Sequence, residues 1–280
     1  MSSSRARGSE VPVTSLPLGA FEWQTFRDLV IHPSHPWLVG LWTTVYVSVV
    51  AQAVGVGLGL VVELVRRSRH AALRAAAGFY VWLLRGTPLL VQLVLVYNGL
   101  AALGVFRFRD VALLGISVPG VIQAGIITLA VNESAYMAEI IRASINSVDK
   151  GQMEAAESLG LTRGRALRFV VLPQAVRIMI PPLGNEFNNM MKVTSLLSVI
   201  GVEELFLNAQ ELNSTTFRTF EIFLAAAVYY LTLTTIWGFI QSWIERRLAA
   251  RSGEVRAAGL GRRLFGSGTG IELGAARGAR

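Results

Sequence analysis

Carboxylate and amide side chains lie inside several apolar stretches of this sequence, where their transfer from water is costly. Glu133 lies near the middle of one stretch, and Glu186 stands between Asn185 and Asn189 in another. A carboxylate in such a place can bind an ammonium group or a cationic side chain. The alternative is a structural role, in which it ties one helix to its neighbours. We take these residues as candidates for a substrate path and leave that alternative open.

Two further polar residues, Thr87 and Gln92, stand at the start of another apolar stretch. They are secondary candidates for the same path, because hydrogen bonds between helices explain them almost as well. Glu139 and Arg142 are three positions apart, so we expect them to form an ion pair on one helix.

Several kinds of chemistry are not expected from the residue types. The chain has no cysteine, which excludes disulfides and thiolate metal sites, and its three histidines lack ligand spacing. It has no GxxxxGK[ST] loop, so we do not expect it to hydrolyse ATP. No nucleophile–base pair or metal cluster is evident, and we expect no cofactor.

The composition indicates which kind of fold holds the candidate polar residues. Of the 280 residues 52% are hydrophobic and only 16% are charged, which is too little charge to cover a soluble domain of this size. The alternating pattern of barrel strands does not occur. The sequence therefore predicts an all-α integral membrane protein. The net charge of +8 resides beside the apolar runs, which indicates orientation in a membrane rather than nucleic-acid binding.

The apolar runs predict about five transmembrane helices within a domain at residues 37–249. A polar N-terminal tail at 1–36 and a disordered basic C-terminal tail at 250–280 flank this domain. In the first span Gly55, Gly57 and Gly59 allow close helix contact, and in the fourth Pro181-Pro182 must interrupt the helix. The five expected spans are Leu41–Val65, Pro88–Val105, Val118–Ile141, Val171–Met191 and Phe220–Ile244.

Basic residues concentrate in alternate loops, which predicts the orientation of the chain. An odd number of spans with this bias places the N-terminus outside and the C-terminus in the cytoplasm. The basic residues on the expected cytoplasmic side are Arg66, Arg67, Arg69, Arg74, Arg85, Arg142, Lys150, Arg163, Arg165, Arg168, Arg177, Arg246, Arg247 and Arg251.

The polar segment between the third and fourth spans predicts a helix–turn–helix hairpin. Ser147 can cap its first helix, Gly160 can end that helix, and Thr162 can cap a second helix that stops at Leu172-Pro173. The first helix is acidic and rich in small residues. This favours insertion into a protein groove over the alternative, an amphipathic hairpin lying on the lipid surface.

The motifs of this segment resemble a known family. The run GQMEAAESLGLTRGRALRFVVLP has EAA, then Gly160, then nine residues and VVLP, while RGTPLLVQ at 85–92 lies upstream. Together they resemble permease subunits of ATP-binding-cassette (ABC) importers for polar amino acids, over about residues 41–249. The resemblance implies that Glu154, Ala155, Ala156 and Gly160 form a coupling helix that sits in a cleft of a separate ATPase subunit.

The resemblance also implies an assembly in the bacterial inner membrane. Its expected partners are ATPase subunits, a second copy of the permease or a similar one, an extracytoplasmic solute-binding protein, the lipid bilayer and an amino-acid substrate. One alternative is a stand-alone secondary transporter or channel for small polar solutes. Five spans leave no equal halves for the repeats that such proteins tend to have. A membrane enzyme ranks last.

Overall fold

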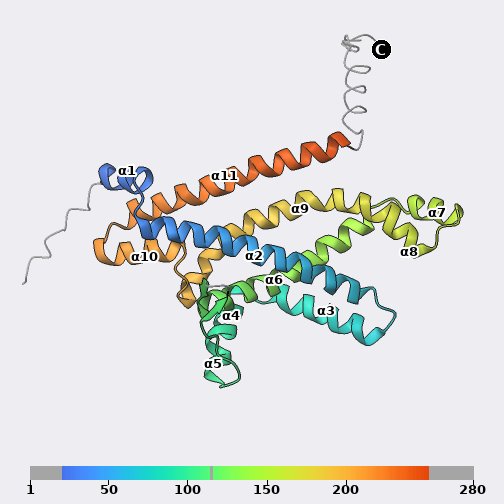
Figure 1. The fold of residues 1–280 in the computed structure, drawn as a ribbon, viewed down its shortest axis with the longest axis horizontal. Helices are drawn as coiled ribbons and strands as arrows, with labels where there is room; N and C mark the ends of the chain where they lie inside the picture. Colours follow the sequence, from blue (N-terminus) through green and yellow to red (C-terminus); the bar gives the residue numbers. More distant parts are fainter. Residues whose placement is uncertain (1–20, 114–115, 252–280) are drawn as a thin grey trace, which may run out of the picture.

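The computed structural model describes residues 21–113 and 116–251, and within them the chain is almost wholly helical, as the all-α class predicts (Figure 1). The exception is a two-stranded antiparallel hairpin of β1 (Val111–Leu113) and β2 (Ile116–Val118). The helices are α1 (Trp23–Ile31), α2 (His35–Arg66), α3 (Ala71–Gly86), α4 (Leu89–Val94), α5 (Leu100–Ala102), α6 (Gly120–Asn146), α7 (Lys150–Ser158), α8 (Arg163–Ala166), α9 (Leu172–Val193), α10 (Leu205–Thr216) and α11 (Thr219–Arg251).

The long helices run along the longest axis of the molecule, with α7 and α8 at one end and α1 and α10 at the other (Figure 1). We call these the α7 end and the α10 end. The segment α4–α5 projects sideways from the bundle, and its helices are joined by a π-helical turn at Leu95–Gly99.

Three helical segments among the described residues are long and apolar enough to cross a membrane: His35–Arg66, Arg163–Ile200 and Thr219–Leu248. They coincide with the first, fourth and fifth predicted spans. A fourth candidate is α3 together with Leu89–Ala102, which are bent by 105° at the break between them. The third predicted span is α6, whose 27 residues give a length of about 40 Å but which is less apolar than these segments and is not one of them.

The second predicted span was placed too late in the chain. It was expected to begin at Pro88, whereas the helix α3 starts at Ala71 and packs against α2 and α6. Arg74 and Arg85 lie near the two ends of α3, so the alanine-rich turns between them were assigned to a basic loop. Pro88 does precede the first residue of α4, but the helix that begins there bends away from the bundle.

The double proline does not break the fourth span, contrary to the sequence prediction. Pro181 and Pro182 both lie inside the continuous helix α9. A proline removes its own N–H from the helical ladder. At the same place Gln241 Nε2 of α11 donates to Pro181 O at 3.2 Å, which joins α9 to α11.

Close contact between α2 and α6 depends on two of the three predicted glycines. A Cβ on Gly55 would lie 2.8 Å from Glu133 Cγ, and one on Gly59 would lie 2.4 Å from Met137 Cβ. A Cβ on Gly57 would meet no described atom within 4 Å, so the prediction was wrong for this residue. Gly55 and Gly59 are four apart and therefore share the face that approaches α6.

The α10 end is held together by a buried carboxylate. Glu204 caps α10 by accepting from the N–H groups of Phe206 and Leu207, each at 2.8 Å, and from the Tyr230 hydroxyl at 2.9 Å. Burial raises the pKa of this carboxyl above its usual range even though these bonds oppose the shift. The contact joins α10 to α11.

Helix α1 lies within the segment expected to be a polar tail. It packs on α11, where the Tyr229 hydroxyl donates to Val30 O at 3.0 Å and Arg218, at the start of α11, pairs with Glu22. Of the expected C-terminal tail, 250 and 251 are the last residues of α11, and the rest lies outside the described residues.

Candidate functional site

The hairpin at the α7 end begins with a different cap from the predicted one. Asp149 is the N-cap of α7, with its Oδ1 accepting from Gly151 N at 2.6 Å. Ser147 instead ends α6, and its hydroxyl donates to Ser144 O at 2.8 Å. Gly160 has the predicted left-handed conformation, with φ of +85°.

The second helix of the hairpin does not stop at Leu172-Pro173, as was predicted. It begins after Thr162, whose side chain makes no capping hydrogen bond, and it continues through a π-helical turn at Leu167–Val171 directly into α9. Pro173 directly follows the π-helical turn and does not interrupt this helix. The hairpin is therefore joined to a span without a flexible link.

Helix α7 divides into a packed face and an exposed face. Ala156 is only 4% exposed, and Met153 packs beside it against a small core that includes Val148 and Val171. Glu154 and Ala155 are exposed. Ala156 therefore stabilises the hairpin, while Glu154 and Ala155 remain available on its surface.

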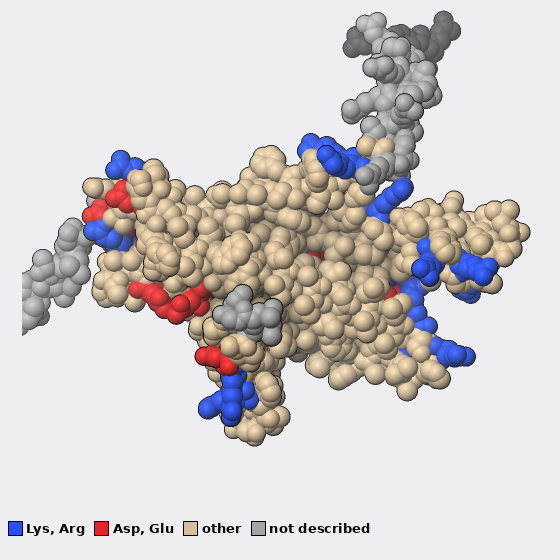
Figure 2. All heavy atoms as spheres, viewed as in Figure 1, with Lys and Arg blue, Asp and Glu red and all other residues tan. Residues whose placement is uncertain are grey.

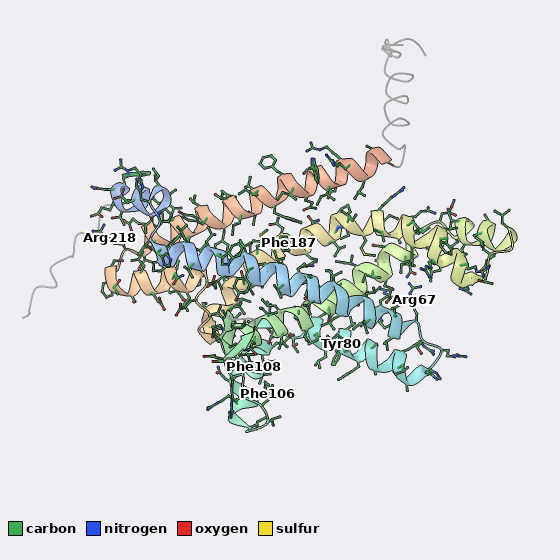
Figure 3. All side chains as sticks on the ribbon, in the orientation of Figure 1. Arg67, Tyr80, Phe106, Phe108, Phe187 and Arg218 are labelled. Atoms are coloured by element: carbon green, nitrogen blue, oxygen red, sulfur yellow. The ribbon has the colours of Figure 1, made fainter. Side chains whose placement is uncertain are left out.

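A polar cavity of about 470 Å³ lies beneath this hairpin. Its wall includes Arg67 at the end of α2 (labelled in Figure 3), Glu154 and Glu157 of α7 and Arg163 of α8. Lys and Arg side chains also gather on the surface at the α7 end, whereas the middle of the molecule is almost free of charge on the face that Figure 2 shows.

The two candidate carboxylates inside the spans lie near each other. Glu133 on α6 is 5% exposed, and its Oε1 accepts from Gln52 Nε2 of α2 at 3.1 Å. Glu186 on α9 is half-buried and close enough to Glu133 for their charges to repel, and Arg85 exerts an opposite attraction on Glu186. The structure therefore brings these two sequence candidates together.

The asparagines on either side of Glu186 face elsewhere. Asn185 is exposed toward α11, and its Oδ1 lies 3.4 Å from Gln241 Nε2. Asn189 is exposed one helical turn further on. Between them Phe187 stacks edge-on against Trp237 of α11, with ring centroids 4.5 Å apart (Figure 3).

Thr87 and Gln92 join a hydrogen-bond network at the 105° bend between α3 and α4. Gln92 Nε2 donates to Thr87 Oγ1 at 2.8 Å and to Leu84 O at 3.0 Å. Asn132 of α6 donates to Gln92 Oε1 at 3.0 Å and to Leu84 O at 3.2 Å. These bonds hold the bend against α6, so the geometry favours the structural role of both residues over substrate contact.

The predicted pair of Glu139 and Arg142 is confirmed and forms part of a larger cluster. Arg142 Nη2 lies 2.7 Å from Glu139 Oε2, and Arg66 Nη1 of α2 lies 2.7 Å from Glu139 Oε1. Arg85 of α3 is 4.0 Å away from the same carboxylate and stacks over Tyr136. The sequence did not indicate Arg66, because nothing local relates it to a residue more than seventy positions away.

An apolar cavity of about 430 Å³ opens between α2, α9 and α11. Gln52 and Gln241 are its polar lining residues, and Phe187 and Trp237 provide aromatic walls. Sequence reasoning missed Gln52, although an amide in the middle of an otherwise apolar span was a signal that could have found it.

Comparison with known proteins identifies the family. The family described as binding-protein-dependent transport system inner membrane component matches residues 55–250. The chain belongs to this family. It is a multi-pass membrane permease subunit and not itself an enzyme.

Relatives of this permease are similar over most of their length. The glutamine transport system permease protein GlnP of Escherichia coli strain K12 is 36% identical over 229 residues, which cover 81% of this chain and 98% of that protein. The probable amino-acid permease protein YxeN of Bacillus subtilis strain 168 is 37% identical over 206 residues, covering 74% of this chain and 88% of that protein.

Solved structures have the same fold. A crystal structure of an amino acid ABC transporter with histidines matches with a TM-score of 0.68 and 40% identity, over 76% of this chain and 94% of that chain. An inward-facing structure of the MetNI methionine ABC transporter matches with a TM-score of 0.62 over 78% of this chain and 98% of that chain. Its identity is 19%, so this second likeness concerns the fold alone.

Proposed function

We propose that this chain is the membrane-spanning permease subunit of an ABC importer for polar amino acids in the bacterial inner membrane. The observation that carries the proposal is the exposed helix α7 of a hairpin whose second helix, α8, continues into α9, in a chain whose relatives are named amino-acid permeases. Those relatives support this function over a stand-alone transporter or channel.

In the proposed importer, the ATPase subunits act on the permease through α7. Glu154 and Ala155 contact a cleft of the ATPase subunit, Ala156 holds the helix on the hairpin core, and Gly160 fixes the turn that follows. Because the second hairpin helix continues into α9, a displacement of α7 moves this span as well. ATP-driven closure of two ATPase subunits then shifts the spans between inward-facing and outward-facing states.

The orientation follows from charge. The basic residues at the end of α2, near the start of α3, at the end of α6 and on α8 lie at the α7 end, which we assign to the cytoplasm. The α10 end then faces outward and receives a solute-binding protein. The N-terminus is outside and the C-terminus is inside.

A total of five spans fits this orientation, because an odd number of crossings places the two termini on opposite sides of the membrane. In addition to the three apolar helices, α3 with its bent continuation makes one crossing and α6 makes another. The ionisable residues of α6 do not oppose its crossing, because Glu133 is buried among neighbouring helices and Glu139 is neutralised by arginines.

The substrate path runs beside α9. Glu133 and Glu186 supply negative charge where α6 and α9 approach, and they attract an ammonium group. Asn185, Asn189 and Lys192 form an exposed polar stripe on α9 that is poorly suited to lipid. A second permease copy, or the wet path between two copies, covers this stripe. Thr87 and Gln92 affect the path through the bend that they hold.

Reconstitution into vesicles tests the proposal. The permease, its ATPase subunits and its solute-binding protein should together accumulate a polar amino acid only when ATP is supplied. Omission of the ATPase should abolish uptake. ATP-independent uptake by the purified chain alone would instead establish the stand-alone transporter.

A further inference from the structure

Four arginines lie in or beside the turn that joins α2 to α3, and two of them have acidic partners. Arg66 Nη1 lies 2.7 Å from Glu139 Oε1 of α6. Arg67 Nε lies 2.7 Å from Glu63 Oε1, four residues earlier in the chain. These two guanidinium groups are therefore paired within the bundle.

The other two arginines, Arg69 and Arg74, are exposed and form no ion pair in the part of the chain that the structure describes. Arg74 Nη1 donates to Ser68 O at 3.0 Å and to Arg69 O at 2.9 Å, which holds this guanidinium against the turn. Its Nε and Nη2 keep their N–H groups for another acceptor. The sequence has no acidic residue between Glu63 and Asp110, so this positive charge lacks a local partner.

Helix α3 follows this turn directly and presents an apolar face on the outside of the bundle (Figure 1). Its inner side packs on α2 and α6 and includes the buried Val81. Phe79 and Trp82 of the outer face have ring centroids 5.5 Å apart and lie about 8 and 12 Å beyond Arg74 along the helix. The outer face has no charged residue and consists of Ala71, Ala72, Ala75, Ala76, Phe79, Trp82 and Leu83.

Guanidinium groups at one level and apolar surface beyond it match the two parts of an anionic phospholipid. A phosphate accepts hydrogen bonds from arginine, and acyl chains lie along apolar side chains. The turn lies at the α7 end, where basic side chains gather on the surface, as expected at the level of lipid headgroups (Figures 1 and 2). Charge and apolar surface therefore follow each other in the order in which a lipid needs them.

Other partners fit this surface less well. A membrane holds two permease copies in the same orientation, so a second copy on α3 would bring its own basic α7 end to the level of Arg69 and Arg74. Like charges would then repel each other. An ATPase subunit approaches from the water and can reach the turn, but it would leave the outer face of α3 uncovered within the membrane.

We propose that the turn and the outer face of α3 bind an anionic phospholipid of the leaflet at the α7 end. Its phosphate accepts hydrogen bonds from Arg69 and Arg74. One acyl chain runs along Ala72, Ala76 and Phe79 toward the middle of the membrane. The proposed orientation determines only that this leaflet is the cytoplasmic one, because the site itself needs neither a substrate nor ATP.

Lipid competition in nanodiscs tests the site. The chain has no cysteine, so Leu73→Cys, at an exposed position beside the outer face of α3, can carry a single bimane fluorophore. Phosphatidylcholine nanodiscs receive increasing fractions of spin-labelled phosphatidylglycerol or of spin-labelled phosphatidylcholine with the same chains, and each lipid quenches the fluorophore when it binds nearby. Phosphatidylglycerol should associate roughly tenfold or more strongly, since two basic residues attract its charge at the membrane surface.

Arg69→Gln together with Arg74→Gln should bring the two association constants close to each other. The matched control is Arg107→Gln together with Arg109→Gln, which removes the same charge from exposed residues between α5 and β1 and should keep the original ratio. Arg69→Gln alone should lower the ratio roughly fivefold. No described residue depends on the Arg69 side chain, so this variant decides the matter even if Arg74→Gln loosens the turn.

Equal association of the two lipids with the chain that has only the label would overturn the inference, and so would equal losses in the two double variants. ATPase subunits added to the nanodiscs should leave the quenching unchanged. If they abolish it, the turn is a protein contact. Displacement of phosphatidylglycerol by an excess of inorganic phosphate would assign the arginines to a soluble anion. Each of these failures leaves the proposed function standing, because that function is tested by ATP-dependent uptake.

Discussion

Gly59 is the residue at which the packing of α2 on α6 is least tolerant of change. An added Cβ would lie 2.9 Å from Ser134 O and 3.0 Å from Ala138 N, as well as 2.4 Å from Met137 Cβ. Backbone atoms cannot move aside cheaply, so Gly59→Ala should destabilise the protein by about 1–3 kcal/mol. Thermal unfolding of the purified chain in detergent measures the loss.

Gly57→Ala provides the control for this prediction, because its Cβ would meet no described atom within 4 Å. It should change the unfolding free energy by less than about 0.5 kcal/mol. Equal effects of the two substitutions would show that helix propensity, rather than the approach of α6, determines the result.

Individual residues could be predicted where a local pattern determined their role. The pair of Glu139 with Arg142 and the left-handed turn at Gly160 follow from short spacings, and both are confirmed. Gln52 and Arg66 could not be assigned, since their partners Glu133 and Glu139 are more than seventy residues away. Only the register of α2 against α6 brings them together.

Helix α7 should transmit force through its exposed face. We expect Glu154→Lys and Gly160→Val to reduce ATP-dependent uptake by roughly tenfold or more while ATP hydrolysis and membrane insertion persist. Lysine reverses the charge offered to the ATPase, and valine is strained at φ of +85°. Paired uptake and phosphate-release assays on the reconstituted complex measure both activities.

Gln152→Lys is the control on the same helix. Its side chain lies toward α9, where Gln152 Oε1 accepts from Gln174 Nε2 at 3.3 Å. This variant should remain coupled although it also adds a positive charge to α7. Normal uptake by both Glu154→Lys and Gly160→Val would count against α7 as the coupling element.

The bend between α3 and α4 should depend on Asn132. Asn132→Ala removes two hydrogen bonds and leaves Gln92 Oε1 without this donor, at an expected cost of about 1–2 kcal/mol of stability. Thermal unfolding of the purified chain measures this loss of stability. Asn98→Ala, an exposed amide on the projecting segment, should be nearly neutral. If Asn132→Ala left the stability unchanged, apolar contacts alone would hold the bend.

Whole elements were predictable where hydrophobicity was continuous. The runs that form α2, α9 and α11 were long and apolar, and their positions were confirmed. Helix α3 was missed because its arginines at the two ends masked a helical segment that packs on the bundle. The continuity of α9 through Pro181 and Pro182 was also missed, since two adjacent prolines remove two N–H groups from the helix and locally predict a break.

At the scale of the molecule, the distribution of basic residues and the position of the hairpin predict the same orientation in the membrane. The α7 end carries the basic surface, and the α10 end lies at the opposite extreme of the long helices. If the positive charge marks the cytoplasm, α7 is available to an ATPase and α10 to an external partner. The orientation therefore determines whether the proposed import mechanism is physically possible.

The absence of cysteine from the sequence makes this orientation directly measurable. Ser158 on α7 and Ser214 on α10 are a matched pair, because both are exposed and both hydroxyls donate to a backbone carbonyl on the preceding turn. In intact cells a membrane-impermeant maleimide should label Ser214→Cys, and Ser158→Cys should react only after permeabilisation. Labelling of Ser158→Cys in intact cells would place α7 outside, beyond the reach of any ATPase.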